Sequence, residues 1–206
     1  MVDKTTDNKL NIISLFRQNY LSHFHVREMA KLIKKSHVTL LPHIQALEND
    51  RIISPKTIGK NKVYSLNLNN IAAKNYMLLA EITEANSYLE QNFLIKKIIS
   101  EIFNLNLTGA IALFGSYAKK TFNSSSDIDL FYLGKIDDDE IKAIQGIGKI
   151  YGKTINIKAL SFENFNSCLR KNDVLIIEIL KNHFLLQNLE LFINEFWRYC
   201  NGIKRE

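Results

Sequence analysis

A polar stretch between two apolar runs, residues 115–130 with the sequence GSYAKKTFNSSSDIDL, places the tightest constraint on the fold of this chain. The apolar run Ala110–Phe114 precedes it and lies between two glycines, a pattern typical of a buried strand. A short helix-like segment over Tyr117–Lys120 and a polar loop then lead into a second strand, predicted over Asp127–Leu133. The chain is therefore expected to form two neighbouring strands that this stretch connects.

Two aspartates at the start of the second strand are the first candidates for chemistry. Alternate residues of a strand point to the same face, so Asp127 and Asp129 are expected to project together while Ile128 and Leu130 face the core. Two carboxylates so placed repel each other unless a cation lies between them. Mg²⁺ suits such a position because it takes a few carboxylate oxygens together with phosphate oxygens and water. We therefore predict that Asp127 and Asp129 bind magnesium.

Length and composition limit the class of protein. The 206 residues are enough for one large domain or two small ones, and a hydrophobic content of 46% allows a real core. No apolar run approaches the ~18 residues of a membrane span, and the polar start MVDKTTDNK lacks the apolar core of a signal peptide. Cys168 and Cys200 are far apart with no metal-binding spacing, which favours reduced thiols. We expect a cytoplasmic protein with no membrane partner.

The positive charge is concentrated in the first third of the chain. Residues 1–70 carry 11 Lys/Arg and 5 Asp/Glu, whereas residues 71–206 carry 16 of each. Four of the five histidines also lie in this first third, but His23 and His25 have no cysteine or acidic ligand beside them, so a metal site there is not favoured. The asymmetry indicates a module that faces nucleic acid, joined to a neutral module.

The basic segment shows the spacing of three helices. Apolar residues recur at helical spacing over residues 8–19 and 26–33, and a third helix reaches Asn49. The start of the third helix is left open by Pro42, because proline is tolerated in a first turn and disrupts a helix interior. Thr39 as N-cap would place Pro42 in the first turn, whereas Ser36 as N-cap would introduce a kink. We expect a loose or kinked start.

A β-hairpin with a basic tip is predicted after the third helix, with arms at Ile52–Ile53 and Val63–Leu66. Three helices followed by such a hairpin resemble the winged helix-turn-helix domain of many prokaryotic regulators, over about residues 8–68. The resemblance implies a recognition helix in a DNA major groove and a wing on the backbone. The residues expected to contact DNA are Lys34, Lys35, His37, Thr39, His43, Lys56, Lys60 and Lys62. The alternative is a helical module for dimerisation or partner binding, with its lysines only solvated.

Residues 69–104 contain no glycine or proline and are expected to be helical. They form either one long helix or two helices with a break near Asn86–Ser87. This segment is expected to separate the basic and neutral modules as a linker and a dimer seam, or to pack on its own domain. A homodimer is the expected assembly, since proteins of the winged-helix class commonly read paired half-sites.

The last third alternates helices and strands, which predicts an α+β fold with a mixed sheet. The acidic run at 137–140 is interpreted as the start of a capped helix, not as a metal site, because acids favour helix N-termini. The expected elements are a helix over 138–151, a strand over 154–160, helices from Ser161 to Leu169 and from Asp173 to Lys181, a strand over 183–186, and a terminal helix over 189–200.

The run LFGSYAKKTFNSSSDIDL resembles the nucleotidyltransferase superfamily, whose members have a DNA polymerase β-like palm. It is most similar to the minimal nucleotidyltransferases of prokaryotes, which are often paired with partners in toxin–antitoxin systems. The resemblance covers about residues 105–200. It implies that Gly115, Ser116 and Lys119 (or Lys120) hold the phosphates of a nucleoside triphosphate, ATP above all, and that Asp127 and Asp129 are the catalytic Mg²⁺ ligands. The acceptor would be a protein hydroxyl or another macromolecule.

Two positions depart from the family pattern. Lys120 stands where the family usually has a small turn residue, often glycine. The third carboxylate of the family comes from the later strand, which here reads KTINIKAL with Asn156 at the aligned position. An amide oxygen can ligate a metal, but it cannot act as a carboxylate base. Enzymatic transfer is therefore uncertain.

Two hypotheses stay open. One is a DNA-binding winged helix (residues 1–68), a helical linker (69–104) and a nucleotidyltransferase (105–206) that modifies an acceptor. The other is a non-catalytic transcriptional regulator or antitoxin that uses a degenerate domain as a sensor of a nucleotide or of a toxin partner.

Overall fold

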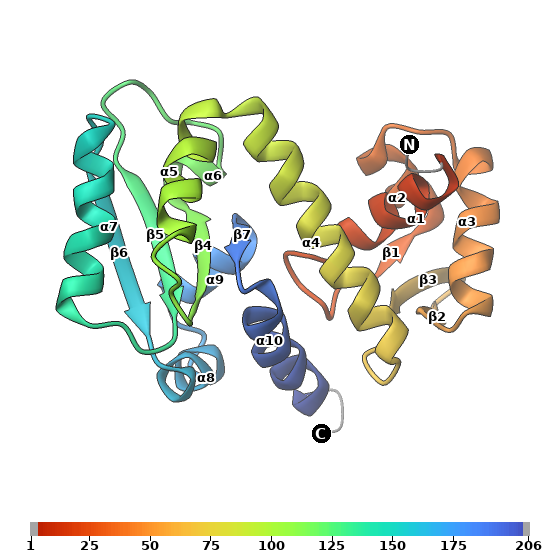
Figure 1. Cartoon of the computed structure of the whole chain (residues 1–206). Coiled ribbons are helices and arrows are strands. Elements are labelled where there is room, and N and C mark those ends of the chain that lie inside the picture. The colour runs from red at the N-terminus through yellow and green to blue at the C-terminus, as the bar shows by residue number, and fades with distance from the viewer. Residues whose placement is uncertain (1–3, 204–206) are drawn as a thin grey trace. The chain divides into compact units, whose positions relative to one another are not determined.

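The structure is a computed structural model that describes residues 4–203, with side chains described from Asn8 onward. It is α+β, and its elements fall into two compact units (Figure 1). The first unit contains the chain up to Ala80 and again from Cys200, and the second contains Glu81–Tyr199. Across the described residues, no helix is both long enough and apolar enough to cross a membrane.

The first unit combines helices with a small antiparallel sheet whose strand order is β1-β3-β2. Its buried side chains come from all three opening helices and from the sheet, which gives the unit a core of its own. Its elements are α1 (Lys4–Ser14), β1 (Phe24–His25), α2 (Val26–Ile33), α3 (His37–Asn49), β2 (Ile53–Ile58), β3 (Asn61–Leu66) and the beginning of α4 (Ile71–Gln91).

The start of α3, which the sequence left open, is fixed by Ser36. The Ser36 side chain accepts a hydrogen bond from the Thr39 backbone N–H at 3.1 Å, so Ser36 is the N-cap and Pro42 lies inside the helix. Leu40 and Ile44 are buried on the core side, and Pro42 lies on the exposed side. A proline that faces solvent leaves the packed face of the helix intact.

The predicted basic hairpin forms, but its strands extend through most of the expected loop at 55–62. Strands β2 and β3 pair from Ile53 opposite Leu66 to Ile58 opposite Asn61. A two-residue turn joins them, and its first residue, Gly59, has a φ of 60°, a value that glycine adopts without steric cost. The short strand β1 adds to the edge of β3. The sequence did not indicate β1, because two residues carry no periodicity.

The second unit has a mixed sheet with the order β6-β5-β4-β7, in which β5 and β6 are parallel and the other pairs antiparallel. The predicted strands and helices of the last third all form, with ends that differ from the prediction by at most three residues. They are α5 (Phe93–Phe103), β4 (Ala110–Phe114), α6 (Gly115–Ala118), β5 (Ile128–Leu133), α7 (Asp138–Ile150), β6 (Ile155–Leu160), α8 (Phe162–Arg170), α9 (Val174–Lys181), β7 (Phe184–Gln187) and α10 (Leu189–Ile203).

Strand β5 is buried on both faces along most of its length. Ile128 and Leu130 face the core that also contains side chains of α5 and α7, as predicted from the alternation. On the opposite face the Phe131 ring packs against Phe165 of α8 and Phe192 of α10, with ring centroids 5.8 and 6.3 Å away. The odd-numbered side chains of β5 therefore share the face that α8 and α10 cover.

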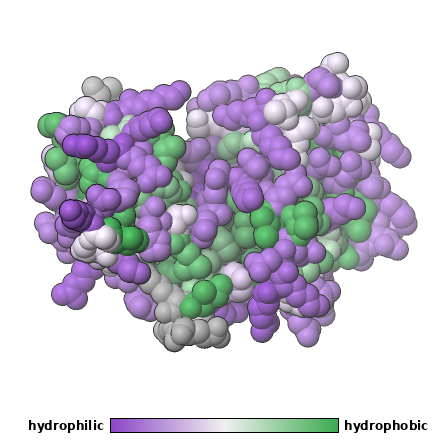
Figure 2. All heavy atoms as spheres, turned by 180° about the vertical axis from the view of Figure 1, so that it is seen from behind, coloured by the Kyte–Doolittle hydropathy of each residue, from purple (hydrophilic) through white to green (hydrophobic). Residues whose placement is uncertain are grey.

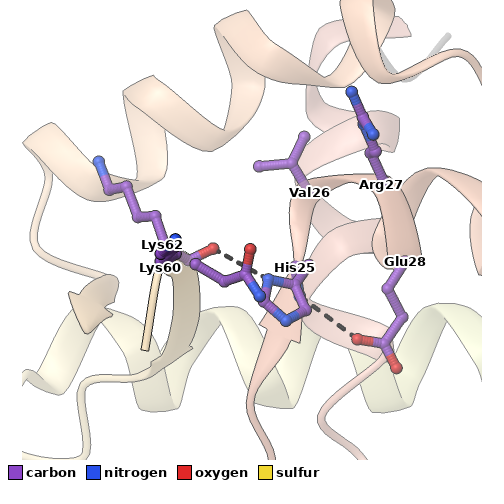
Figure 3. A pocket seen from close by; sticks show the side chains of 7 residues that line it. His25, Val26, Arg27, Glu28, Lys60 and Lys62 are labelled. Atoms are coloured by element: carbon purple, nitrogen blue, oxygen red, sulfur yellow. Dashed lines mark hydrogen bonds between the residues drawn. The ribbon is translucent and has the colours of Figure 1, made fainter. Parts of the chain in front are cut away.

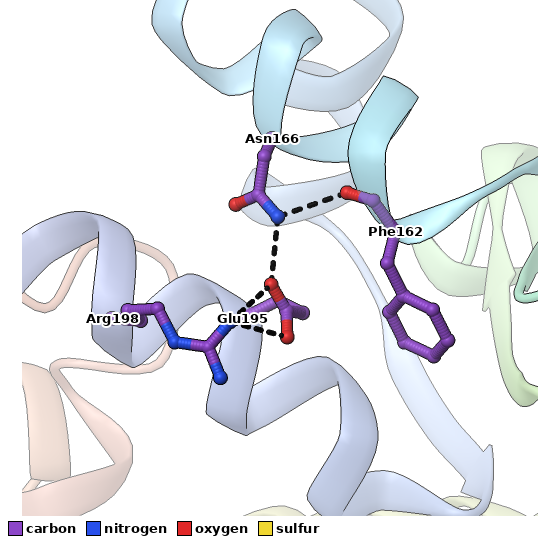
Figure 4. A network of polar contacts seen from close by, with 4 residues as sticks. All are labelled: Phe162, Asn166, Glu195 and Arg198. Carbon is purple, nitrogen blue, oxygen red and sulfur yellow. Dashed lines mark hydrogen bonds and ion pairs between the residues drawn. The ribbon is translucent and has the colours of Figure 1, made fainter.

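A buried carboxylate joins these two helices (Figure 4). Asn166 of α8 donates from Nδ2 to Glu195 Oε2 of α10 at 2.7 Å and to the Phe162 carbonyl at 2.9 Å. Arg198 donates to both oxygens of the same carboxylate, at 3.0 and 3.1 Å. The Glu195 charge is therefore compensated, which its burial requires.

The break between α4 and α5 lies at Asn92, six residues beyond the expected position at Asn86. Asn92 donates from its side chain to the Tyr88 carbonyl at 2.8 Å, and this bond satisfies one of the carbonyls that a helix end leaves open. Asn86 and Ser87 remain inside α4, since polar residues on an exposed helical face do not end a helix by themselves. Helix α5 then buries Ile95 in the core of the second unit.

The exposed apolar side chains do not dominate the surface. Figure 2 shows one face of the molecule, on which hydrophilic side chains predominate and apolar ones form separate small groups. Single apolar residues at a surface are ordinary in folded proteins and need no further account.

Candidate functional site

Three polar side chains meet at the start of β5. Because β5 and β6 are parallel with Asp129 opposite Asn156, the Asn156 side chain lies beside both aspartates. Its Nδ2 donates to Asp129 Oδ1 at 3.2 Å and to Asp127 Oδ2 at 3.4 Å. The amide N–H groups thus occupy the space between the two carboxylates and offset part of their mutual repulsion.

The turn after β4 lies against the same carboxylates. Phe114 is paired with Asp129, and the next residue, Gly115, has a φ of 68°. A Cβ atom added at Gly115 would lie 2.2 Å from Asp129 Oδ2, a distance that real Cβ atoms do not reach. Only glycine fits here, for its φ and for its lack of a side chain. The Gly115–Ser116 turn and the aspartate pair therefore form one site, to which two distant segments contribute.

The loop between α6 and β5 is held by polar contacts. Lys120 adopts a φ of 58°, the left-handed region in which glycine is favoured, and this explains why a small residue is expected at this turn. Lys153 donates from Nζ to the Ser124 carbonyl at 2.6 Å and to the Ser126 carbonyl at 3.3 Å. Since Ser126 directly precedes Asp127, Lys153 helps to fix the position of the first aspartate.

Lys119 does not stand alone as a phosphate-binding cation. Its Nζ pairs with Glu178 Oε1 of α9 at 2.5 Å, and both side chains are partly exposed. An exposed pair of this kind contributes at most about 1 kcal/mol, so a stronger anionic ligand could displace the carboxylate. The sequence could not indicate this partner, because Glu178 is 59 residues away along the chain.

The donor set fits Mg²⁺ better than a metal that needs several protein ligands. Among the side chains described, residues 8–203, no group of three or more His, Cys, Asp and Glu is arranged to hold a metal ion. Asp127 and Asp129 offer two carboxylates, and Asn156 would offer an amide oxygen if its side chain turned over. Mg²⁺ commonly binds through one or two carboxylates and takes its other oxygens from phosphates and water.

The acidic run at the start of α7 is a helix cap, as expected. The Asp137 side chain accepts from the backbone N–H groups of Asp139 at 3.0 Å and Glu140 at 2.8 Å. The Glu140 side chain in turn accepts from the Asp137 N–H, which completes a capping box.

Most residues expected to contact DNA are exposed in the first unit; these are Lys34, Lys35, His37, Thr39, Lys56, Lys60 and Lys62. His43 is the exception, since it is half-buried and its Nε2 lies 3.0 Å from Asn8 Nδ2. Lys62 also pairs with Glu48 at 3.1 Å, and its bonds to Tyr64 and Glu48 raise its pKa.

A polar pocket of about 700 Å³ lies where the hairpin tip meets the start of α2 (Figure 3). Arg27, Lys60 and Lys62 contribute three cationic side chains to its lining, against the single acid Glu28. His25 joins the two elements, since its Nδ1 lies 3.2 Å from the Lys62 carbonyl. Neither His25 nor Arg27 was among the residues expected to contact DNA.

Comparison with known proteins shows what part of the second unit is similar to. Residues 94–187 match the family described as the nucleotidyltransferase domain, a range that contains the Gly115–Ser116 turn, both aspartates and Asn156. This part of the chain is similar to nucleotidyltransferase domains. No sequence among the curated proteins matches the chain.

One solved structure is similar to part of the chain: a crystal structure of a toxin–antitoxin with AMP-PNP. The similarity has 16% sequence identity and a TM-score of 0.38, and it covers 53% of this chain and 86% of the other.

Proposed function

We propose that the nucleotidyltransferase domain binds a nucleoside triphosphate together with Mg²⁺ at Gly115, Ser116, Asp127 and Asp129. The observation that supports this most directly is the contact between the Gly115 turn and Asp129, where a Cβ atom has no room. A backbone without a side chain lets phosphate oxygens approach the N–H groups of the turn while the carboxylates hold the metal. ATP is the expected nucleotide.

The chemistry available at the site favours binding over turnover. Bound Mg²⁺ would neutralise triphosphate charge, and the two aspartates would hold it. Transfer to a hydroxyl also benefits from a group that accepts the hydroxyl proton. Asn156 occupies the position from which a third carboxylate would act, and its amide now donates to the aspartates instead. We therefore propose that the domain acts mainly as a nucleotide sensor. Transfer of a nucleotidyl group to a protein or other macromolecular acceptor would be a weaker activity of the same site.

Two measurements test this proposal. ATP should bind the full chain only when Mg²⁺ is present, and Asp129→Asn should weaken binding at least tenfold. Asp139→Asn is the matched control, because Asp139 is an exposed aspartate whose ion-pair partner is Lys142. Equal ATP binding by the wild type and Asp129→Asn would overturn the proposal.

The question of transfer needs an acceptor. The chain is incubated with α-labelled ATP, GTP, CTP or UTP, Mg²⁺ and a cell extract, and the labelled products are separated. Labelling by Asn156→Asp and not by the wild type would assign the native chain to the non-catalytic class. Labelling by the wild type would assign it to the transferases.

A second function, DNA binding by the first unit, is favoured by the charge of its surface. The basic residues of the hairpin tip and of the α2–α3 turn are exposed, and the pocket in Figure 3 has Arg27 on the wall opposite Lys60. We propose that this unit acts as a winged helix-turn-helix domain, with α3 in a groove and the hairpin on phosphates. His43 is less exposed than the other expected contacts, and its Nε2 lies 3.0 Å from Asn8 Nδ2.

Salt dependence tests the DNA proposal. Affinity for duplex DNA should fall steeply with salt, and Lys60→Ala should reduce the slope of log K against log salt by about 1, as expected for one lost phosphate contact. Lys142→Ala in the second unit is the control and should leave the slope unchanged. Binding that does not depend on salt would contradict the proposal.

A further inference from the structure

A second pocket in the nucleotidyltransferase domain, of about 470 Å³, is lined mainly by apolar and aromatic groups. The start of α5, the residue Tyr117 of α6, the loop after α6 and the residue Lys153 form its walls. These four segments are brought together only by the fold. The volume lies in the range of pockets that hold small molecules, which is roughly 300–1,000 Å³.

Aromatic rings form one side of this pocket. Tyr117 and Phe122 are stacked, with centroids 4.3 Å apart and ring planes within 8°. Tyr117 is only 3% exposed, whereas Phe122 is 39% exposed and Phe93 is 67% exposed. Aromatic surface left open in a concave site offers a planar ring favourable stacking contacts. A ring bound against Phe122 and Phe93 would remove apolar surface of both side chains from water, which favours binding.

The only charged side chain in the pocket lining is a cation. Lys153 donates to two backbone carbonyls, and its Nζ lies 5.8 Å from the Tyr117 ring centroid. Neither partner carries charge, and from Asn8 to residue 203, where side chains are described, no carboxylate lies within salt-bridge distance of Lys153. A second cation lies near one lining residue, since Lys97 Nζ is 4.7 Å from the Phe93 ring centroid. An apolar pocket with this charge favours an anionic group attached to an aromatic body.

This pocket is separate from the metal site. The Tyr117 side chain belongs to the core that contains Ile128 and Leu130. Asp127 and Asp129 alternate with those residues along the strand and point to the opposite face. The loop that Lys153 fixes lies between the two sites in sequence, since it runs from the pocket residue Ser124 to Asp127.

We propose that the pocket at Phe93, Tyr117, Phe122 and Lys153 is a binding site for a small planar aromatic molecule that carries an anionic group. The ring stacks on the Phe122 side of the aromatic wall, and the anion pairs with the Lys153 ammonium. This site is additional to the proposed triphosphate site and does not depend on it.

The test uses 1-anilinonaphthalene-8-sulfonate, an aromatic sulfonate whose fluorescence rises on transfer to an apolar site. The full chain is titrated without Mg²⁺ or nucleotide. One saturable site is expected. Phe122→Ala and Lys153→Met should each weaken it at least tenfold, and Lys153→Arg should retain it because the charge remains. Phe103→Ala and Lys142→Met remove an exposed phenylalanine and an exposed lysine from elsewhere in the domain and should leave it unchanged.

Circular dichroism identifies variants that have lost the fold, and affinities are compared among folded variants. If Lys153→Met does not fold, Phe122→Leu serves instead, since it keeps apolar volume and removes the stacking ring. Unchanged affinity in the folded Phe122 variant, or no saturable site in the wild type, would overturn the proposal. Because no nucleotide is present, this result is independent of whether ATP binds at Asp127 and Asp129.

Discussion

Replacing Asn156 by aspartate should convert the site into one that is unstable without Mg²⁺ and is rescued by it. The Asn156 amide donates to carboxylate oxygens 3.2 and 3.4 Å away, so the substitution exchanges two attractive contacts for two like-charge contacts at similar distances. In water, two like unit charges about 4 Å apart repel each other by about 1 kcal/mol. The value for water applies here, and not the larger one for a protein interior, because the site is exposed. The two repulsions together cost about 2 kcal/mol.

The loss is measurable as a melting temperature. For a chain of this size about 1 kcal/mol corresponds to roughly 2–4 °C, so Asn156→Asp should melt roughly 4–8 °C below the wild type in the presence of a chelator. Mg²⁺ binds the native state and should restore most of this difference, since it neutralises the three carboxylates. The assay is thermal unfolding followed by circular dichroism, with and without Mg²⁺.

Asn156→Ala separates charge from hydrogen bonding. This substitution removes the two hydrogen bonds of the Asn156 side chain and adds no charge. The variant should therefore melt closer to the wild type, and Mg²⁺ should stabilise it no more than it stabilises the wild type. If Asn156→Asp and Asn156→Ala melt alike, and if Mg²⁺ raises neither more than the wild type, the three side chains do not act as one cation site. That result would refute the reasoning.

Three further outcomes are expected. Gly115→Ala should lower stability by about 1–2 kcal/mol for the positive φ alone, and it should abolish Mg²⁺-dependent ATP binding because the new Cβ displaces Asp129; a variant that binds ATP normally would contradict this. Tyr88→Phe should cost about 1–3 kcal/mol, since it removes the buried hydrogen bond to the α6 carbonyl, and a denaturant titration of both proteins measures the change. Burial raises the pKa of the Cys200 thiol to about 12, so at pH 8 iodoacetamide should alkylate the half-buried Cys168 first and reach Cys200 only after unfolding, as mass spectrometry would show.

Much of the second unit could be predicted because its signals are local. Glycines lie on both sides of the apolar run of β4, and Asp137 precedes the acidic first turn of α7. The residues next to each element therefore indicate where it begins or ends. The alternation at Asp127–Leu130 also fixed which side chains share a face, because that follows from strand geometry alone. The break after α4 was placed too early, since it depends on a side-chain contact of Asn92 and not on composition.

Two features of the first unit could not be predicted, because they depend on residues that are distant in the sequence. Its basic charge and three helices were visible in the sequence, but the contact between His43 and Asn8 joins residues 35 positions apart. Likewise β1 exists only because β3 offers an edge to pair with. Neither feature leaves a periodic trace in the sequence.

The sequence by itself determined most of the elements and the residues of the candidate metal site. The tertiary structure decided which of those residues meet: Asn156 with both aspartates, Gly115 with Asp129, and Lys119 with Glu178. The physical reason is the distance along the chain over which each kind of interaction acts. Helical and strand periodicity, caps and turns are set by neighbours within a few residues. Contacts between side chains from different strands and helices are set by register and packing, which are properties of the folded chain.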